Sequence, residues 1–144
     1  MCGNVTRAAQ ERIVWQTREV RVRLIGYWRG ESDHHLPDPR DFVDETWDDR
    51  ERDLVARYLE EGFSPWAFAG YSQCRICGKA NGCAELTDGV YLWPEGLAHY
   101  VREHSVKLPD DVLDHITYRQ DELSALDVDR AWWPRVASLE NREK

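Results

Sequence analysis

A Cys-x2-Cys-Gly knuckle at Cys74, Cys77 and Gly78 constrains the fold of this chain more than any other feature. Two cysteines separated by two residues can both reach one metal ion, because the turn between them brings their sulfurs to the same side. A glycine directly after the second cysteine relieves crowding where that turn closes. The sequence therefore predicts a metal-binding turn midway along the chain.

The residues after the knuckle predict a β-hairpin and then a helix. Residues 84–92 form two strand-like runs around an Asp-Gly dipeptide, which suits a two-residue type I′ turn. Pro94 can open a helix with Glu95 in its first turn. This helix is expected to carry His99 and to end near His104, so that two imidazoles follow the two thiols.

These side chains predict a structural Zn²⁺ site with Cys74, Cys77, His99 and His104 as ligands. Residues five apart on an ideal helix lie about 140° apart around its axis, so we expect the helix to loosen before His104. Cys83 is an alternative ligand, in a three-Cys one-His site, or else a small buried apolar residue. A metal-free chain is the third alternative.

The order of knuckle, hairpin and helix resembles zinc fingers of the two-Cys two-His and treble-clef kinds. The resemblance covers residues 74–104 and implies a structural metal. The spacing departs from both kinds, since 21 residues separate Cys77 from His99 and treble-clef helices usually offer ligands from their first turn. The same stretch also resembles small uncharacterised bacterial proteins, and that likeness implies no activity.

Short strands are expected before the first helix. Residues 20–24 alternate between apolar and basic side chains, which predicts a strand with Val20, Val22 and Leu24 facing inward. Further along the chain, after the first helix, Ser64-Pro65 predicts a turn. The predicted class is α+β, with short antiparallel N-terminal strands packed with helices beside the zinc-stapled module. We expect one compact domain, comprising a weakly ordered lead-in at 1–10, an α+β part at 11–70, the zinc module at 71–108 and a helical part at 109–144.

Capping residues and apolar spacing predict further helices. The first begins with Thr46 as its N-cap and ends before Gly62. Its inward stripe is expected to comprise Trp47, Leu54, Val55, Tyr58 and Leu59. The second begins at Pro109 and runs to about Leu126. Its apolar face is expected to comprise Val112, Leu113, Ile116, Leu123 and Leu126. Asp129 can cap a last short helix that contains two tryptophans.

Composition limits the compartment and the partners. No apolar run reaches the roughly 20 residues that span a bilayer or shows the pattern of a signal peptide, so we expect no membrane span and a cytoplasmic location. In a reducing compartment, four unevenly placed cysteines favour a metal over disulfides. The net charge of −8 argues against nucleic acid and is compatible with a basic protein partner.

We expect this protein to act by binding an unknown protein partner and not as an enzyme, because four protein ligands close a zinc site to substrate. The sequence leaves the oligomeric state open. One candidate surface is the acidic helix between Asp44 and Glu61. The other candidate consists of whichever aromatic side chains are exposed among Trp66, Phe68, Trp93, Trp132 and Trp133.

Two rival functions remain open at this stage. An enzyme could assemble its active site from scattered residues, namely His34, Asp44, Glu45 and Glu103. A nucleic-acid reader could combine the zinc module with the basic residues Arg18, Arg21, Arg23 and Arg29. For His34 and His35, a surface loop is the preferred interpretation, because the side chains of adjacent residues diverge.

Overall fold

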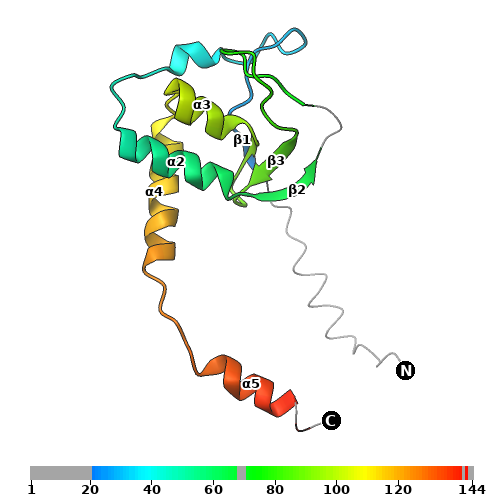
Figure 1. The fold of residues 1–144 in the computed structure, drawn as a ribbon, viewed down its shortest axis with the longest axis vertical. Helices are drawn as coiled ribbons and strands as arrows, with labels where there is room; N and C mark the ends of the chain where they lie inside the picture. The colour runs from blue at the N-terminus through cyan, green and yellow to red at the C-terminus, as the bar shows by residue number, and fades with distance from the viewer. Residues whose placement is uncertain (1–20, 68–70, 141, 143–144) are drawn as a thin grey trace, which may run out of the picture. The chain divides into compact units, whose positions relative to one another are not determined.

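The computed structural model describes residues 21–67, 71–140 and 142, and the chain divides into two compact units, Met1–Lys107 and Leu108–Lys144 (Figure 1). The described part of the first unit contains β1 (Arg23–Leu24), a short 3-10 helix η1 (Pro39–Phe42), α2 (Asp49–Glu60), β2 (Phe63–Ala67), β3 (Ala84–Thr87), β4 (Tyr91–Pro94) and α3 (Leu97–His104). The second unit contains α4 (Asp110–Ser124) and α5 (Trp132–Glu140). The predicted α+β class is confirmed, and the expected lead-in at residues 1–10 lies outside the described residues.

The four strands form one mixed sheet in the order β1-β4-β3-β2. β3 runs antiparallel to both β2 and β4, as strands joined in sequence commonly do. β1 pairs with β4 in parallel, so that Arg23 lies opposite Tyr91 and Leu24 opposite Leu92. The predicted hairpin is therefore confirmed, and an earlier stretch of chain extends it at one edge.

The turn of this hairpin is longer than the predicted two residues. Strand β3 ends at Thr87 and β4 begins at Tyr91, so residues 88–90 connect the strands. Among them only Gly89 has a positive φ, of 88°, whereas a type I′ turn needs positive φ at both central residues. The carboxylate of Asp88 instead accepts hydrogen bonds from the amides of Val90 and Tyr91 at 2.9 and 2.8 Å, and so fixes the turn.

The burial predicted for the first strand is wrong. Leu24 is 64% exposed and Val22 is only half-buried, while Val20 lies outside the described residues. β1 is a two-residue strand at the edge of the sheet, and strict alternation there does not decide which side chains are covered.

The expected turn at Ser64-Pro65 is also wrong, because both residues belong to strand β2. This strand lies at the other edge of the sheet, and its pairing with β3 is irregular between Phe63 and Trp66. A proline is tolerated at an edge or a bulge because its missing N–H removes no hydrogen bond that the ladder needs.

Helix α2 begins two residues later than the sequence predicted. Its N-cap is Asp48, whose carboxylate accepts from the amides at positions 50 and 51, both at 3.0 Å. Thr46 instead donates its hydroxyl to Asp44 at 2.6 Å, so its oxygen does not cap the helix. The inward face is displaced as well, because Leu54 is 45% exposed whereas Ala56 is fully buried.

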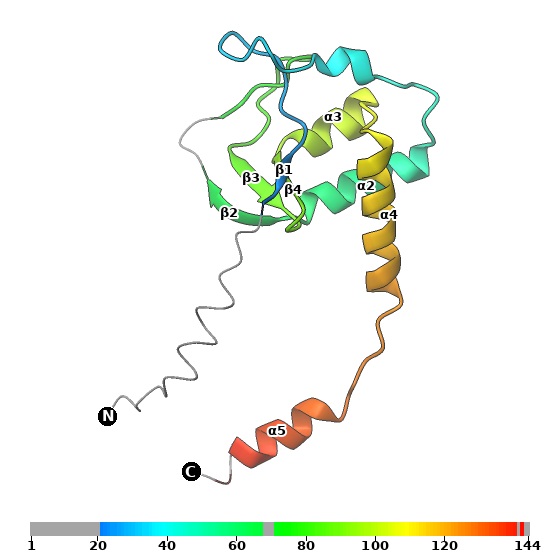
Figure 2. The ribbon, with the colours of Figure 1, turned by 180° about the vertical axis from the view of Figure 1, so that it is seen from behind.

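Trp93 of β4 is the largest of the fully buried side chains among the described residues, at 1% exposed, so it is not the surface aromatic that we considered. Its indole N–H donates to the carbonyl of Leu59 at 3.0 Å, which ties the sheet to α2. Leu97 and Val101 of α3 are fully buried, and α2 packs beside α3 (Figures 1 and 2). An ion pair between Arg102 and Glu60 joins the outer sides of these helices. This packing fixes α3, the helix that carries both histidines.

In the second unit, Pro109 is the N-cap of α4. The first half of its predicted apolar face is buried and consists of Val112, Leu113 and Ile116. The second half of the predicted apolar face is wrong, because Leu123 and Leu126 are 56% and 66% exposed. Leu123 lies in the last turn of α4, and Leu126 lies beyond the end of the helix. Asp129 caps α5 as predicted, accepting from the amide of Trp132 at 3.1 Å.

Within the described ranges, the helices are too short or too polar to cross a membrane.

Gly62 provides a test of this packing, because a side chain there would enter the core. An alanine Cβ would lie 2.7 Å from Cζ2 of Trp93 and 2.9 Å from Cβ of Leu86. We expect Gly62→Ala to lower the free energy of unfolding by about 1–3 kcal/mol, measured by urea denaturation. Gly30→Ala is the control, because its Cβ would meet only the end of the exposed Arg75 side chain, and we expect a change within about 0.5 kcal/mol. Equal stability of the two variants would contradict this account.

Candidate metal centre

The knuckle is a tight turn held by its own backbone. The amide of Gly78 donates to the carbonyl of Cys74 at 2.8 Å, and the amide of Cys74 donates to Lys79 at 2.8 Å. Gly78 has a φ of 74°, a conformation that glycine adopts without a steric cost. Cys74 is buried and Cys77 is exposed, so the pair of thiols lies at the border between core and solvent.

The helix that carries the histidines begins at Leu97 and not at Pro94, which is the last residue of β4. The strand pairing continues past the proline, because the amide of Glu95 donates to Ala84 at 2.9 Å. Gly96 then forms the N-cap of α3 and its carbonyl accepts from the buried Asn81 side chain at 3.1 Å. His99 consequently lies in the first turn of the helix.

The last turn of α3 is widened, which brings the two histidines together. The amide of Ser105 donates to the carbonyl of Tyr100, five residues back, the spacing of a π-type turn. Ser105 itself is left-handed, with φ 52° and ψ 32°, and ends the helix directly after His104. The two imidazole rings are 5.0 Å apart between centroids and inclined at 80°. The expected loosening therefore occurs in the turn that contains His104.

Cys74, Cys77, His99 and His104 converge on one point. Their possible ligand atoms all lie within 4.8 Å of one another, and Sγ of Cys77 is 3.3 Å from Nε2 of His99. In a tetrahedral zinc site, the bond lengths put neighbouring ligand atoms roughly 3.3–3.8 Å apart, so closure on an ion needs shifts of about 1 Å. The four side chains therefore lie close enough to hold a metal ion.

His104 supplies an independent test of this fit. Its Nε2 atom is buried and has no hydrogen-bond partner among the residues that the structure describes. A buried polar atom without a partner costs free energy, and a bond to a metal ion would remove that cost. The donor set of two thiols and two imidazoles is also the set that favours Zn²⁺.

Cys83, the alternative ligand, is not a member of this cluster. Its backbone amide is bound by the carboxylate of Glu95 at 3.0 Å, where strand β3 begins. Its side chain is half-buried. The structure thus brings together the two-Cys two-His set.

Local hydrogen bonds favour the deprotonated form of the buried Cys74 thiol. Burial by itself raises the pKa of Cys74, but the amides of Cys77 and Ile76 point at its sulfur and, with a hydroxyl from Tyr100, bring that pKa below its usual value. Burial, and then the neighbouring His104, lower the pKa of His99. A thiolate and a neutral imidazole are the forms that bind a metal ion.

Tyr100 positions the knuckle against α3, and sequence reasoning missed it. Its hydroxyl accepts from the amide of Arg75 at 2.7 Å and donates to the sulfur of Cys74. Burial is the main reason that the pKa of Tyr100 rises to about 12, so the hydroxyl keeps its proton. The signal in the sequence was its spacing, because a residue four positions before His104 lies on the same side of a helix.

The residues considered for an enzyme's active site are exposed or already bound to other side chains. His34 and His35 are both exposed, and so is Glu103. The carboxylate of Asp44 is occupied by Thr46 and an ion pair with Lys107. Among the residues that the structure describes, the group of Cys, His and acidic side chains close enough to hold a metal ion is the group on the knuckle and α3.

The basic residues considered for nucleic-acid binding are exposed where the structure describes them. These are Arg21, Arg23 and Arg29, while Arg18 lies outside the described residues.

The chain matches no family model, no curated protein and no solved structure. The chemistry of its own side chains is therefore the basis for assigning a function.

Tyr100→Phe tests the bridge between the knuckle and the helix. Loss of the hydroxyl removes a hydrogen bond to the Cys74 thiolate, and we expect metal affinity to fall by about 10- to 100-fold, measured by competition with a chromophoric chelator. Tyr91→Phe, which removes the hydroxyl of another buried tyrosine, should leave the affinity unchanged. If the two variants bind metal equally well, the positioning role of Tyr100 is wrong.

Proposed function

We propose that the protein binds one Zn²⁺ ion through Cys74, Cys77, His99 and His104 in a closed structural site, and that the fold held by this site is a protein-binding module. The convergence of the four ligand atoms within 4.8 Å supports the metal assignment. When bound, the ion would supply a cross-link between the knuckle and α3. Four protein ligands leave no position for substrate or water, which favours a structural role over a catalytic one.

Apart from a metal ion, the knuckle segment, residues 71–83, is held by a small apolar contact and a few hydrogen bonds to other parts of the unit. Within it only Cys74 and Asn81 are buried, and Ile76 is partly buried against the cluster that contains Cys74, so hydrophobic burial is limited. Structural zinc supplies on the order of 10–16 kcal/mol of apparent binding free energy in small modules, comparable with the roughly 5–15 kcal/mol that stabilises a whole domain. The order of this segment is therefore expected to depend on the ion.

A protein partner is supported by the exposed side chains and the charge. Trp66, Trp132 and Trp133 are 52%, 51% and 64% exposed, and tryptophan is enriched in the residues that dominate binding energy. The acidic helix is the weaker candidate surface, because several of its carboxylates already pair with arginines, as in Asp49–Arg52 and Asp53–Arg57. The net charge of −8 favours a partner with a basic surface.

Cys77→Ser tests the metal assignment. We expect the wild-type chain to carry one zinc per chain and the variant to lose stoichiometric zinc and to become poorly soluble, because a closed site with three ligands no longer holds the knuckle. Elemental analysis of the purified proteins measures the first effect. The soluble fraction after expression measures the second. Protection of the amides of residues 71–83 and α3 from hydrogen exchange, before and after chelation of the wild-type protein, measures the loss of order that causes it.

Cys83→Ser is the matched control, because it removes a thiol only six residues away that lies outside the cluster. It should keep full zinc content and wild-type hydrogen exchange. A fully folded, metal-free Cys77→Ser variant would refute the structural role, and equal loss of zinc in both variants would refute the ligand set.

A further inference from the structure

Six large apolar side chains are in solvent along the C-terminal segment, defined here as residues 121–139. Between 51% and 66% of each is exposed, and they are Leu123, Leu126, Val128, Trp132, Trp133 and Leu139. Scattered single apolar residues are normal on a protein surface, but a concentration of this kind marks an interaction site. The segment therefore has the composition of a binding surface.

Helix α5 has an apolar face that is suited to binding. Trp132, Val136 and Leu139 recur at helical spacing and lie on one side, while the rings of Trp132 and Trp133 stack at 6.4 Å. The helix has nine residues, and isolated helices shorter than about 12–15 residues are marginal in water. Burial of this face against another surface would stabilise the helix.

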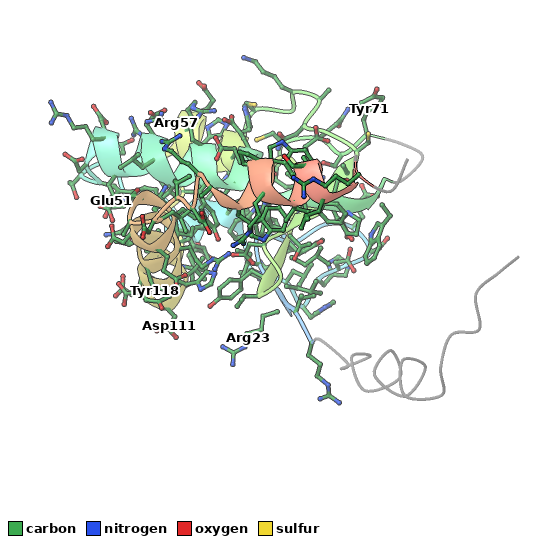
Figure 3. The ribbon with its side chains drawn as sticks, turned by 90° about the horizontal axis from the view of Figure 1, so that it is seen from below. Arg23, Glu51, Arg57, Tyr71, Asp111 and Tyr118 are labelled. Carbon is green, nitrogen blue, oxygen red and sulfur yellow. The ribbon has the colours of Figure 1, made fainter. Side chains whose placement is uncertain are left out.

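The part of the segment before α5 is acidic. Residues 121–131 contain Asp121, Glu122, Asp127 and Asp129 against one basic residue, Arg130. Asp111 and Tyr118 project from helix α4 of the same unit (Figure 3), and Asp111 adds a further carboxylate. These charges complement a basic protein surface. They would be repelled by anionic lipid, to which interfacial helices bind through lysine and arginine.

We propose that the C-terminal segment binds a partner protein through an apolar groove bordered by lysine and arginine side chains. The face of α5 that contains Trp132 and Leu139 occupies the groove, and Asp127 and Asp129 lie against its basic rim. This is the helix-in-groove mode of recognition. The inference rests on the proposed protein-binding function but not on the metal, whose ligands belong to the other compact unit.

The test uses two synthetic helical hairpins as probes. Both present a leucine-lined groove, which is bordered by lysines in one hairpin and by glutamates in the other. Fluorescence anisotropy of each labelled hairpin is measured against the full-length, zinc-loaded protein. We expect the lysine hairpin to bind at least about tenfold more tightly than the glutamate hairpin, and its affinity to fall as salt is raised.

The variant that tests the apolar face is Trp132→Ala/Trp133→Ala. We expect it to bind the lysine hairpin at least about tenfold more weakly, because the groove would lose the Trp132 indole and that indole would lose the Trp133 ring stacked on it. Phe63→Ala is the matched control, since Phe63 is an exposed aromatic residue, at 71%, on strand β2 of the first unit. It should bind like the wild type. Circular dichroism and zinc content verify that each variant is folded.

Several results would overturn the proposal. They are equal binding of the two hairpins, no binding of either, and wild-type affinity in the double variant. Wild-type binding to phosphatidylcholine vesicles with or without phosphatidylglycerol, lost in the double variant, would identify a membrane as the occupant. A dimer in sedimentation equilibrium that the double variant loses would identify a second copy of this chain.

The failure of this inference can be distinguished from the failure of the proposed function. If a partner captured from native extract forms a stoichiometric complex with the wild type and the double variant alike, the protein-binding function stands and the C-terminal segment is not its surface. If the hairpins behave as expected but the wild-type protein holds no zinc, only the metal assignment fails.

Discussion

The convergence of two thiols and two imidazoles between the knuckle and helix α3 is the interaction on which, with the proposed metal bound, the order of residues 71–83 would depend. That stretch buries little apolar surface beyond Cys74 and Ile76. Many of its backbone hydrogen bonds are local, such as that from Gly78 to Cys74, and Arg75 adds bonds to Tyr100 and Arg40. The helix at the other side of the site is fixed independently, because Leu97 and Val101 are fully buried beside the core that surrounds Trp93. A metal ion would therefore join a segment with little hydrophobic stabilisation to one that is already held in place.

Helix α3 performs two tasks with one short stretch of sequence. One side packs against α2, to which Arg102 adds an ion pair with Glu60. The other side presents His99, His104 and Tyr100 to the knuckle, and Tyr100 binds both the Arg75 amide and the Cys74 sulfur. The wide last turn lets His99 and His104 lie on the same side of α3, whereas a regular helix would direct residues five apart to different sides. Four protein ligands would close the site to other molecules, so the proposed partner would bind elsewhere on the surface of the protein.

Some short-range patterns predicted this fold correctly, whereas others, such as the turn at Ser64-Pro65 and the helix start at Pro94, were wrong. The Cys-x2-Cys-Gly turn, the hairpin that begins at Ala84 and the cap at Asp129 are each specified by neighbouring residues, and the structure contains all three. Predictions that depended on what packs against an element were less accurate. Leu24 and Leu54 fit an inward pattern and are exposed, because an edge strand and the edge of a helix face are covered only if another element lies there. Thr46 was displaced as a cap by Asp48, which stands at the position where the helix actually begins.

By itself, the sequence determined the α+β class and the ligand types, because a thiol knuckle and paired histidines have few other uses at this spacing. Only the tertiary structure decided which four side chains meet. It excludes Cys83 from the cluster because Glu95 binds its backbone at the start of β3, and it places His104 beside His99 through a turn whose width no local pattern encodes. The reason is physical, since ligand types follow from side-chain chemistry, whereas their convergence depends on hydrogen bonds and packing between residues far apart in the chain.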